Sequence, residues 1–118
     1  MNEELKTIFG NSITVVRSQQ SVQIPTAHLI YKGSSTEYVT WTIISNRPEL
    51  FANDDFLFEV YQVDVDVYSK GNYLDIVSKV KELMKTNNYL WVDDSTEMYE
   101  EDTGYYHKTI TFEKERMN

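Results

Sequence analysis

The fold is decided by a segment in which the spacing of apolar residues changes, Glu59-Val-Tyr-Gln-Val-Asp-Val-Asp-Val-Tyr-Ser-Lys-Gly-Asn-Tyr-Leu-Asp-Ile-Val-Ser-Lys-Val-Lys-Glu-Leu-Met84. In its first half every second residue is apolar or aromatic, at Tyr61, Val63, Val65 and Val67. The residues between them are polar, at Gln62, Asp64 and Asp66. This period of two is typical of a strand with one buried and one solvated face, and it predicts a long strand over residues 56–68.

A turn and a helix are expected after this strand. Beyond Ser69-Lys-Gly-Asn72, apolar side chains recur three and four residues apart, at Tyr73, Ile76, Val77, Val80, Leu83 and Met84. Side chains at this spacing share one stripe of an amphipathic helix, which we predict over about residues 72–85. Asn72 suits the N-cap, because its side chain can accept a hydrogen bond from a free backbone N–H of the first turn.

The other segments predict further strands and one short helix. We expect a helix over residues 3–9, strands over 28–31 and 37–45, a loop over 49–55, and a C-terminal β-hairpin made of residues 89–99 and 105–113. Pro48 should end the strand before it, because proline cannot donate to a strand ladder. The expected fold class is therefore α+β, an antiparallel β-sheet with one main amphipathic helix packed across it, in a single domain over residues 1–118.

Composition removes several classes of function. The 118 residues include no cysteine, which excludes disulfides, thiolate zinc sites and cysteine nucleophiles. The formal net charge is −8, and the eleven Lys and Arg residues are scattered, whereas a DNA-binding surface needs them clustered. We therefore expect no specific nucleic-acid binding. The N-terminal segment is acidic and no apolar run reaches about 18 residues, so we expect no membrane partner and a cytoplasmic start.

Carboxylates offer the first candidate chemistry. Asp64 and Asp66 share one face of the long strand, and Asp93-Asp94 could lie near them on another strand. Paired carboxylates can bind Mg²⁺ or act as acid and base, but strand alternation alone also places polar groups there. The polar tip Asn53-Asp54-Asp55 lacks the glycine and the later glutamate of a calcium-binding loop.

The two histidines give little support to a metal site. His28 and His107 are far apart in the chain and have no H-x-H or H-E-x-x-H spacing. The four glycines build no phosphate-binding loop, and no serine stands in a G-x-S-x-G context. We therefore expect no catalytic residue, metal or cofactor, and keep a metal-dependent hydrolase using Asp64, Asp66 and a histidine as a minor alternative.

Aromatic residues point toward protein partners. The chain has nine tyrosines, five phenylalanines and two tryptophans, and a domain of this size cannot bury all of them. Tyrosine is enriched at interfaces, and the unpaired edge strands of a sheet can pair with a neighbouring chain. We therefore expect a protein that works through its surfaces.

Four segments carry a resemblance to a known family. They are Tyr-Gln-Val-Asp-Val-Asp-Val-Tyr-Ser-Lys-Gly-Asn-Tyr over residues 61–73 with Val-Lys-Glu-Leu-Met over 80–84, Met-Tyr-Glu-Glu-Asp-Thr-Gly-Tyr-Tyr-His-Lys over 98–108, and Ile-Pro-Thr-Ala-His-Leu-Ile-Tyr-Lys-Gly over 24–33. Together they resemble the tail-completion or tail-terminator proteins of long-tailed, siphovirus-type phages and prophages. The likeness covers about residues 24–113.

The resemblance implies a structural protein without catalysis. Members of that family resemble an α+β subunit that forms a hexameric ring, caps the head-proximal end of the tail tube and presents a surface to the head connector. The implied partners are other copies of the chain, the major tail tube protein and the head–tail connector protein. The implied location is the host cytoplasm during assembly and then the virion. A head-closure or connector-adaptor protein of the same joining region is the alternative.

A ring of acidic subunits suggests a role for the carboxylates. Acidic groups that line its hole would repel DNA phosphates and let a genome pass. The candidates for an interaction or lumen surface are Asn53, Asp54, Asp55, Asp64, Asp66, Glu100, Glu101 and Asp102.

Overall fold

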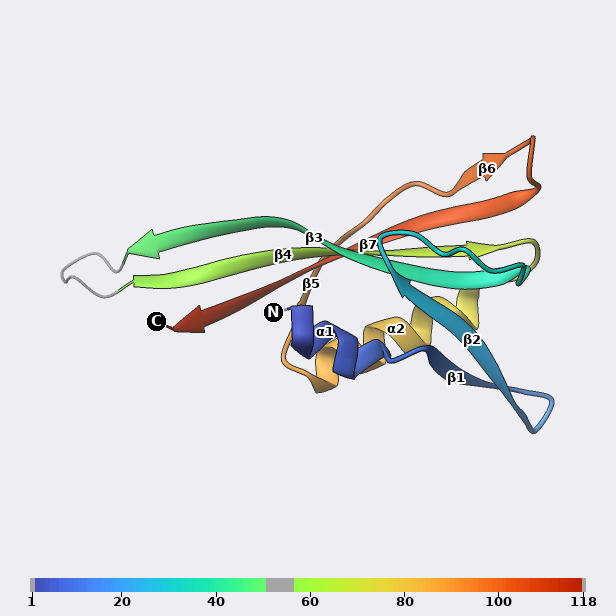
Figure 1. Cartoon of the computed structure of the whole chain (residues 1–118), viewed down its shortest axis with the longest axis horizontal. Helices are drawn as coiled ribbons and strands as arrows, with labels where there is room; N and C mark the ends of the chain where they lie inside the picture. Colours follow the sequence, from blue (N-terminus) through green and yellow to red (C-terminus); the bar gives the residue numbers. More distant parts are fainter. Residues whose placement is uncertain (1, 51–56, 118) are drawn as a thin grey trace.

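A computed structural model describes residues 2–50 and 57–117 of the chain (Figure 1). In this part of the chain the elements follow in the order α1 (Asn2–Phe9), β1 (Ser12–Arg17), β2 (Gln20–His28), β3 (Glu37–Leu50), β4 (Leu57–Ser69), α2 (Leu74–Thr86), β5 (Leu90–Asp94), β6 (Met98–Glu100) and β7 (Tyr105–Met117). Most of these residues lie in strands, and none of the helices among them is long and apolar enough to cross a membrane.

The sheet is mixed, so the expected antiparallel sheet is wrong. Its strands run in the order β1-β2-β3-β4-β7-β5, and β6 pairs with β7 beside β5. The parallel contact is between β2 and β3, where Thr26, Ala27 and His28 pair with Val39, Thr40 and Trp41. The sequence did not indicate it, because the period-two pattern of a strand carries no information on the direction of its neighbour.

A β1–β2 hairpin was also missed. Arg17 pairs with Gln20, which leaves Ser18 and Gln19 as a two-residue loop. Both have positive φ, 50° and 65°, as the favoured two-residue hairpin turns require. Neither residue is a glycine, asparagine or aspartate, so the usual sequence signal of such a turn is absent.

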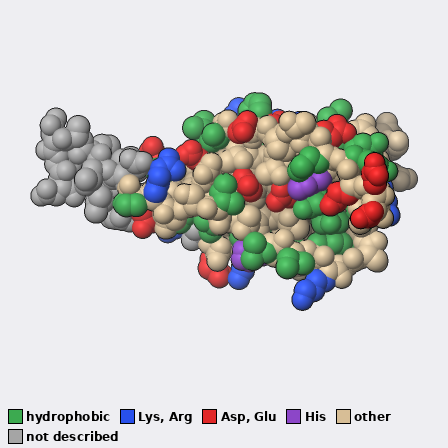
Figure 2. Space-filling model, turned by 90° about the horizontal axis from the view of Figure 1, so that it is seen from above, with side chains coloured by type: hydrophobic (Ala, Val, Ile, Leu, Met, Phe, Trp, Pro, Cys, Tyr) green, Lys and Arg blue, Asp and Glu red, His purple; other side chains and the backbone are tan. Residues whose placement is uncertain are grey.

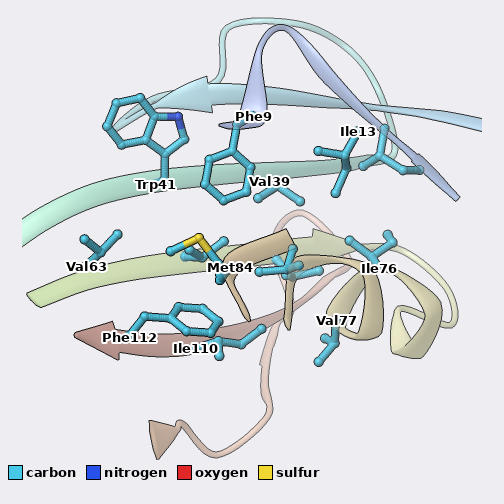
Figure 3. Packing of buried hydrophobic residues seen from close by; sticks show 14 of the residues in the cluster. Phe9, Ile13, Val39, Trp41, Val63, Ile76, Val77, Met84, Ile110 and Phe112 are labelled. Carbon is cyan, nitrogen blue, oxygen red and sulfur yellow. The ribbon is translucent and has the colours of Figure 1, made fainter. Parts of the chain in front are cut away.

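Both helices lie on one face of the sheet, which also corrects the expectation of one main helix across it (Figure 1). Leu5 and Phe9 of α1 are fully buried, as are Ile76, Val80 and Met84 of α2. In the core, the Phe9 ring stacks on Trp41 at 6.4 Å between centroids, and Val63, Ile110 and Phe112 lie beneath α2 (Figure 3). The fold is thus mostly β, a curled mixed sheet with two helices on its concave side. We call this side the inner face and the opposite side the outer face.

Strand β3 continues through Pro48, so the prediction that proline ends it is wrong. Pro48 pairs with Glu59 of β4, in a part of β3 beyond the contact with β2. On that side β3 is an edge, where the missing N–H costs no ladder bond. The ends of β3, β4 and β7 project past the helices as an arm (Figure 1), and the molecule is 52 Å long.

The first arm of the expected C-terminal hairpin is broken into two strands. Leu90 to Asp94 of β5 and Met98 to Glu100 of β6 both pair antiparallel with β7. Between them, Ser95 bonds twice to Thr109: its N–H donates to the Thr109 carbonyl and its Oγ accepts from the Thr109 N–H. The side chain of Ser95 therefore replaces one ladder bond at the break.

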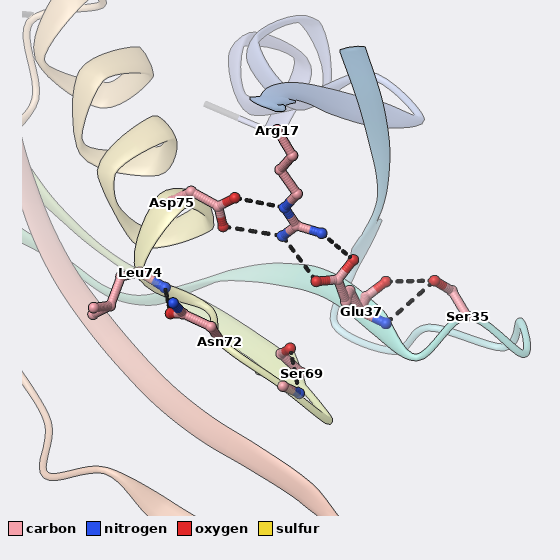
Figure 4. A network of polar contacts seen from close by, with 8 residues as sticks. Arg17, Ser35, Glu37, Ser69, Asn72, Leu74 and Asp75 are labelled. Atoms are coloured by element: carbon pink, nitrogen blue, oxygen red, sulfur yellow. Dashed lines mark hydrogen bonds and ion pairs between the residues drawn. The ribbon is translucent and has the colours of Figure 1, made fainter. Parts of the chain in front are cut away.

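The junction between β4 and α2 differs by one residue from the prediction (Figure 4). The helix begins at Leu74 with Tyr73 at the N-cap position, and Asn72 accepts a hydrogen bond at 3.0 Å from the Leu74 N–H. Asp75 in the first turn accepts two hydrogen bonds from Arg17 of β1, of 2.5 and 3.0 Å. Arg17 also reaches Glu37 of β3 at 2.8 Å, so one guanidinium joins β1, β3 and α2.

This network should make stability depend on pH. The hydrogen bonds from Arg17 lower the pKa of Asp75 below its ordinary value of 3.8. A lowered pKa means that the contribution is complete above about pH 4 and is lost as the pH falls through the folded value. We expect Asp75→Asn to reduce stability near pH 7 by about 1 kcal/mol, with a smaller difference from the parent at pH 3. Urea unfolding at pH 7 and pH 3 measures this stability difference. An equal loss at both pH values would contradict a stabilising role for the Asp75 carboxylate.

Candidate functional site

The outer face of the sheet carries the candidate carboxylates as a row of hydrogen-bonded pairs. Asp64 accepts a hydrogen bond from the Thr111 hydroxyl at 2.6 Å. Asp66 accepts one from the Thr109 hydroxyl and contacts His107 Nε2 at 2.9 Å. Thr109, Thr111 and His107 all belong to β7, directly beside β4. Both carboxylates therefore bind neighbours within the sheet, as the solvated face of an alternating strand would.

This geometry does not assemble a metal cage. In the part of the chain that the structure describes, no group of three or more His, Cys, Asp and Glu side chains could hold a metal ion. His28 pairs with Trp41 between β2 and β3, and its ring stacks on Trp41 at 4.3 Å. Asp94 of β5 binds Lys81 and Lys108 instead of approaching Asp64. Among the described residues, Asp64 and Asp66 are therefore partnered by side chains of β7.

A ladder of stacked rings crosses the same face. Tyr31 stacks on Tyr38 at 4.5 Å, Tyr38 on Tyr68 at 4.6 Å, and Tyr68 on His107 at 4.2 Å. Tyr105 meets Tyr38 and Tyr68 edge-on, and its hydroxyl donates to the Ser35 carbonyl at 2.7 Å. The rings cover one another's faces, so the ladder stiffens the sheet and offers mainly ring edges to a partner.

Burial within this ladder changes the acidity of its tyrosines. Burial raises the pKa of Tyr68 to about 12, with a smaller contribution from the charge of Asp66. Burial also raises the pKa of Tyr38, and the charge of Glu100 contributes to it. Glu100 therefore lies close enough to the ladder to act on it. Tyr38 and Tyr68 therefore stay neutral at physiological pH.

The predicted surface residues fall into three places. Asp64 and Asp66 lie in the middle of the outer face, whereas Glu100, Glu101 and Asp102 are exposed at the turn between β6 and β7. Asn53, Asp54 and Asp55 lie outside the described residues. Figure 2 looks onto the outer face, where acidic side chains are spread among hydrophobic ones and basic side chains lie mostly at the margins.

The edges of the sheet carry residues that the sequence analysis did not single out. Leu90, Trp91 and Val92 of β5 are exposed to 69%, 54% and 45%, and β5 is the last strand at one end of the sheet. At the other end, Val16 of β1 is 69% exposed. The available signal was the uninterrupted apolar run Leu90-Trp-Val92, because a strand with one solvated face would alternate.

The chain was compared with protein-family models and with curated protein sequences, and neither comparison gives a match. Its function is therefore inferred from the fold, from the surfaces described above and from the resemblance of the four sequence segments.

Proposed function

We propose that this chain is the structural subunit of a ring that caps the head-proximal end of a phage tail tube. In that role it stops the tube and offers a surface to the head connector. The proposal joins the sequence resemblance to one structural observation, the free strands β1 and β5 at the two ends of the strand order. It assigns binding to surfaces and no catalytic step to any residue.

The two edges are suited to self-assembly. The strands β1 and β5 end the sheet on opposite sides, and each exposes apolar side chains next to unpaired backbone groups. Unpaired edges invite a neighbouring chain. When two different surfaces of one subunit bind each other, the contact is heterologous, and it closes into a ring if the rotation between neighbours allows it.

The charge distribution fits a ring through which DNA passes. The chain carries a formal net charge of −8, and acidic side chains are spread over the outer face in Figure 2. Glu100, Glu101 and Asp102 are the exposed members of the predicted lumen surface. Asp64 and Asp66 are bound by side chains of β7, so they contribute charge to the face without being free to move.

Assembly in the absence of this protein tests the role. We expect electron microscopy to show tail tubes of uncontrolled length when the protein is missing. Adding it back should restore one length, because the ring blocks further subunits. Tubes of normal length that fail to join heads would contradict a terminator and indicate the connector-adaptor alternative.

The lumen role gives a separate prediction. Replacing Glu100, Glu101 and Asp102 by their amides should make assembled rings retain DNA at low salt, because three repulsive charges per subunit are lost. Filter binding of labelled duplex DNA measures it. The control carries amides at Glu3, Glu97 and Glu115, which are exposed outside the turn between β6 and β7. Equal retention by both variants would show that total charge matters and that the position of these three does not.

A further inference from the structure

The free edge of β5 has the composition of a binding hot spot. Leu90, Trp91 and Val92 are consecutive and all exposed, with Trp91 at 54%. The register between β5 and β7 shifts between Trp91 and Asp93, so Val92 is an extra residue in a bulge. Apolar side chains therefore project from both faces of this short strand. Tryptophan is the residue most often found to dominate protein interfaces.

Trp91 is also held in place before any partner arrives. Its indole N–H donates to Asp94 Oδ1 at 2.8 Å, and the Lys81 ammonium lies over its ring at 3.8 Å from the centroid. Lys81 in turn binds Asp94 Oδ2 at 3.1 Å. A side chain that is fixed yet half exposed loses little conformational entropy on binding, which is the usual property of an anchor residue.

A groove lies at the opposite end of the sheet, between β1 and α2. It consists of a hollow of about 380 Å³ beside Val15 and Val16 and a second of about 240 Å³ beside Ile13 and Leu83. Thr14 and Lys79 line both hollows, so the groove follows the free edge of β1. Apolar side chains of Ile8, Ile13 and Leu83 line the smaller hollow, whereas Val15 and Val16 share the larger one with polar and charged side chains.

The two surfaces are complementary in strand length and charge. Strand β5 has five residues and β1 has six, so either edge can extend the ladder of the other. Directly after the apolar run of β5, Asp93 is exposed, whereas Lys79 occupies the middle of the groove. Asp75 at the groove wall is already bound by Arg17, and Glu82 lies 3.8 Å from Lys79.

We propose that the β5 edge of one copy of this chain docks in the β1–α2 groove of the next copy, with Trp91 as its anchor. The contact is heterologous, and Asp93 faces Lys79 across it. Strand β5 contains no Lys or Arg, so a β5 edge paired with the β5 edge of a second copy would offer Asp93 no cation from that strand. The inference deepens the proposed function, because its ring needs a head-to-tail contact, but the contact itself can form without a tail tube.

The absence of cysteine from the chain allows a direct test. Two variants are made, Val16→Cys and Val92→Cys, the second with a small tag that changes its mass, and a short bis-maleimide is added to each alone and to their mixture. We expect a covalent heterodimer from the mixture and no dimer from either variant alone. The control pair uses Ile44→Cys, which is 48% exposed in β3 and belongs to neither β1 nor β5, in place of Val16→Cys. Crosslinking of the control to the same extent would overturn the proposal, as would a dimer from Val92→Cys alone.

Charge reversal provides the second arm. Asp93→Lys in the Val92→Cys copy, or Lys79→Glu in the Val16→Cys copy, should each lower the heterodimer yield by about fivefold. Mixing the two doubly substituted copies should restore the yield. If the heterodimer yield does not recover when both charges are reversed, Asp93 and Lys79 do not face each other and the proposed docking geometry is wrong. Rings seen on tail tubes without the heterodimer would refute this docking and leave the proposed function standing. A heterodimer with no ring on tubes would refute the proposed function alone.

Discussion

Val65→Asp is expected to abolish folding at 25 °C. Val65 is fully buried in the middle of β4, between Trp41 of β3 and Ile110 of β7 on the inner face. An aspartate there loses the apolar contacts of valine and buries a carboxyl group, which must stay unpaired or be protonated. The expected loss exceeds about 5 kcal/mol, comparable with the whole stability of an ordinary domain. Far-UV circular dichroism and urea unfolding measure it.

The same substitution at an exposed strand position is the control. Val16 is 69% exposed on the edge strand β1, so Val16→Asp removes little buried area and leaves the carboxylate in water. Its effect on the free energy of unfolding should stay below about 1 kcal/mol. A cooperative unfolding transition of near-parent midpoint for Val65→Asp would show that β4 has the opposite face turned inward and would refute the register described above.

The central module could be predicted because two local signals agree in it. Valines 63, 65 and 67 are fully buried, and Ile76, Val80 and Met84 line the buried stripe of α2. Side-chain spacing reports directly which face is buried, so these elements follow from the sequence. Spacing does not report which strands are neighbours, so the parallel β2–β3 contact could not be predicted from the sequence.

The short helix α1 was predicted at residues 3–9, but its part in the core was not. α1 has eight residues, yet Leu5 and Phe9 bury completely in the core. A helix this short has little stability of its own, and its role comes from tertiary packing that no local pattern reveals. Pro48 shows the same dependence, because its place in β3 is tolerated only where β2 has already ended.

The candidate site also has one part that the sequence predicts and another that depends on strand order. Asp64 and Asp66 could be placed on one face from alternation, but their partners Thr111 and His107 come from β7, more than forty residues away. The exposed edge of β5 depends on strand order, which makes Leu90 and Trp91 terminal in the sheet. Trp41 and Trp91 are alike in the sequence, since both stand in strand-forming segments, and only the topology separates their roles.

That difference makes the two tryptophans the most informative pair to replace. Trp41 is 2% exposed and stacks on Phe9 and His28, so Trp41→Ala should cost about 3–5 kcal/mol of folding stability through the cavity it leaves. Trp91→Ala loses one hydrogen bond and one cation–π contact at a half-exposed site, and should cost about 1–2 kcal/mol. Urea unfolding followed by circular dichroism compares them without relying on tryptophan fluorescence.

Assembly should respond in the reverse order. Under conditions where both variants are folded, Trp91→Ala should weaken crosslinking between copies by at least about tenfold, because an anchor residue dominates an interface of this kind. Trp41→Ala should leave crosslinking at the parent level in its folded fraction, since its side chain touches neither edge. The Val16→Cys and Val92→Cys pair reports this yield in each background. If Trp91→Ala crosslinks as well as the parent, the exposed β5 edge is not the contact, and the ring must close through another surface.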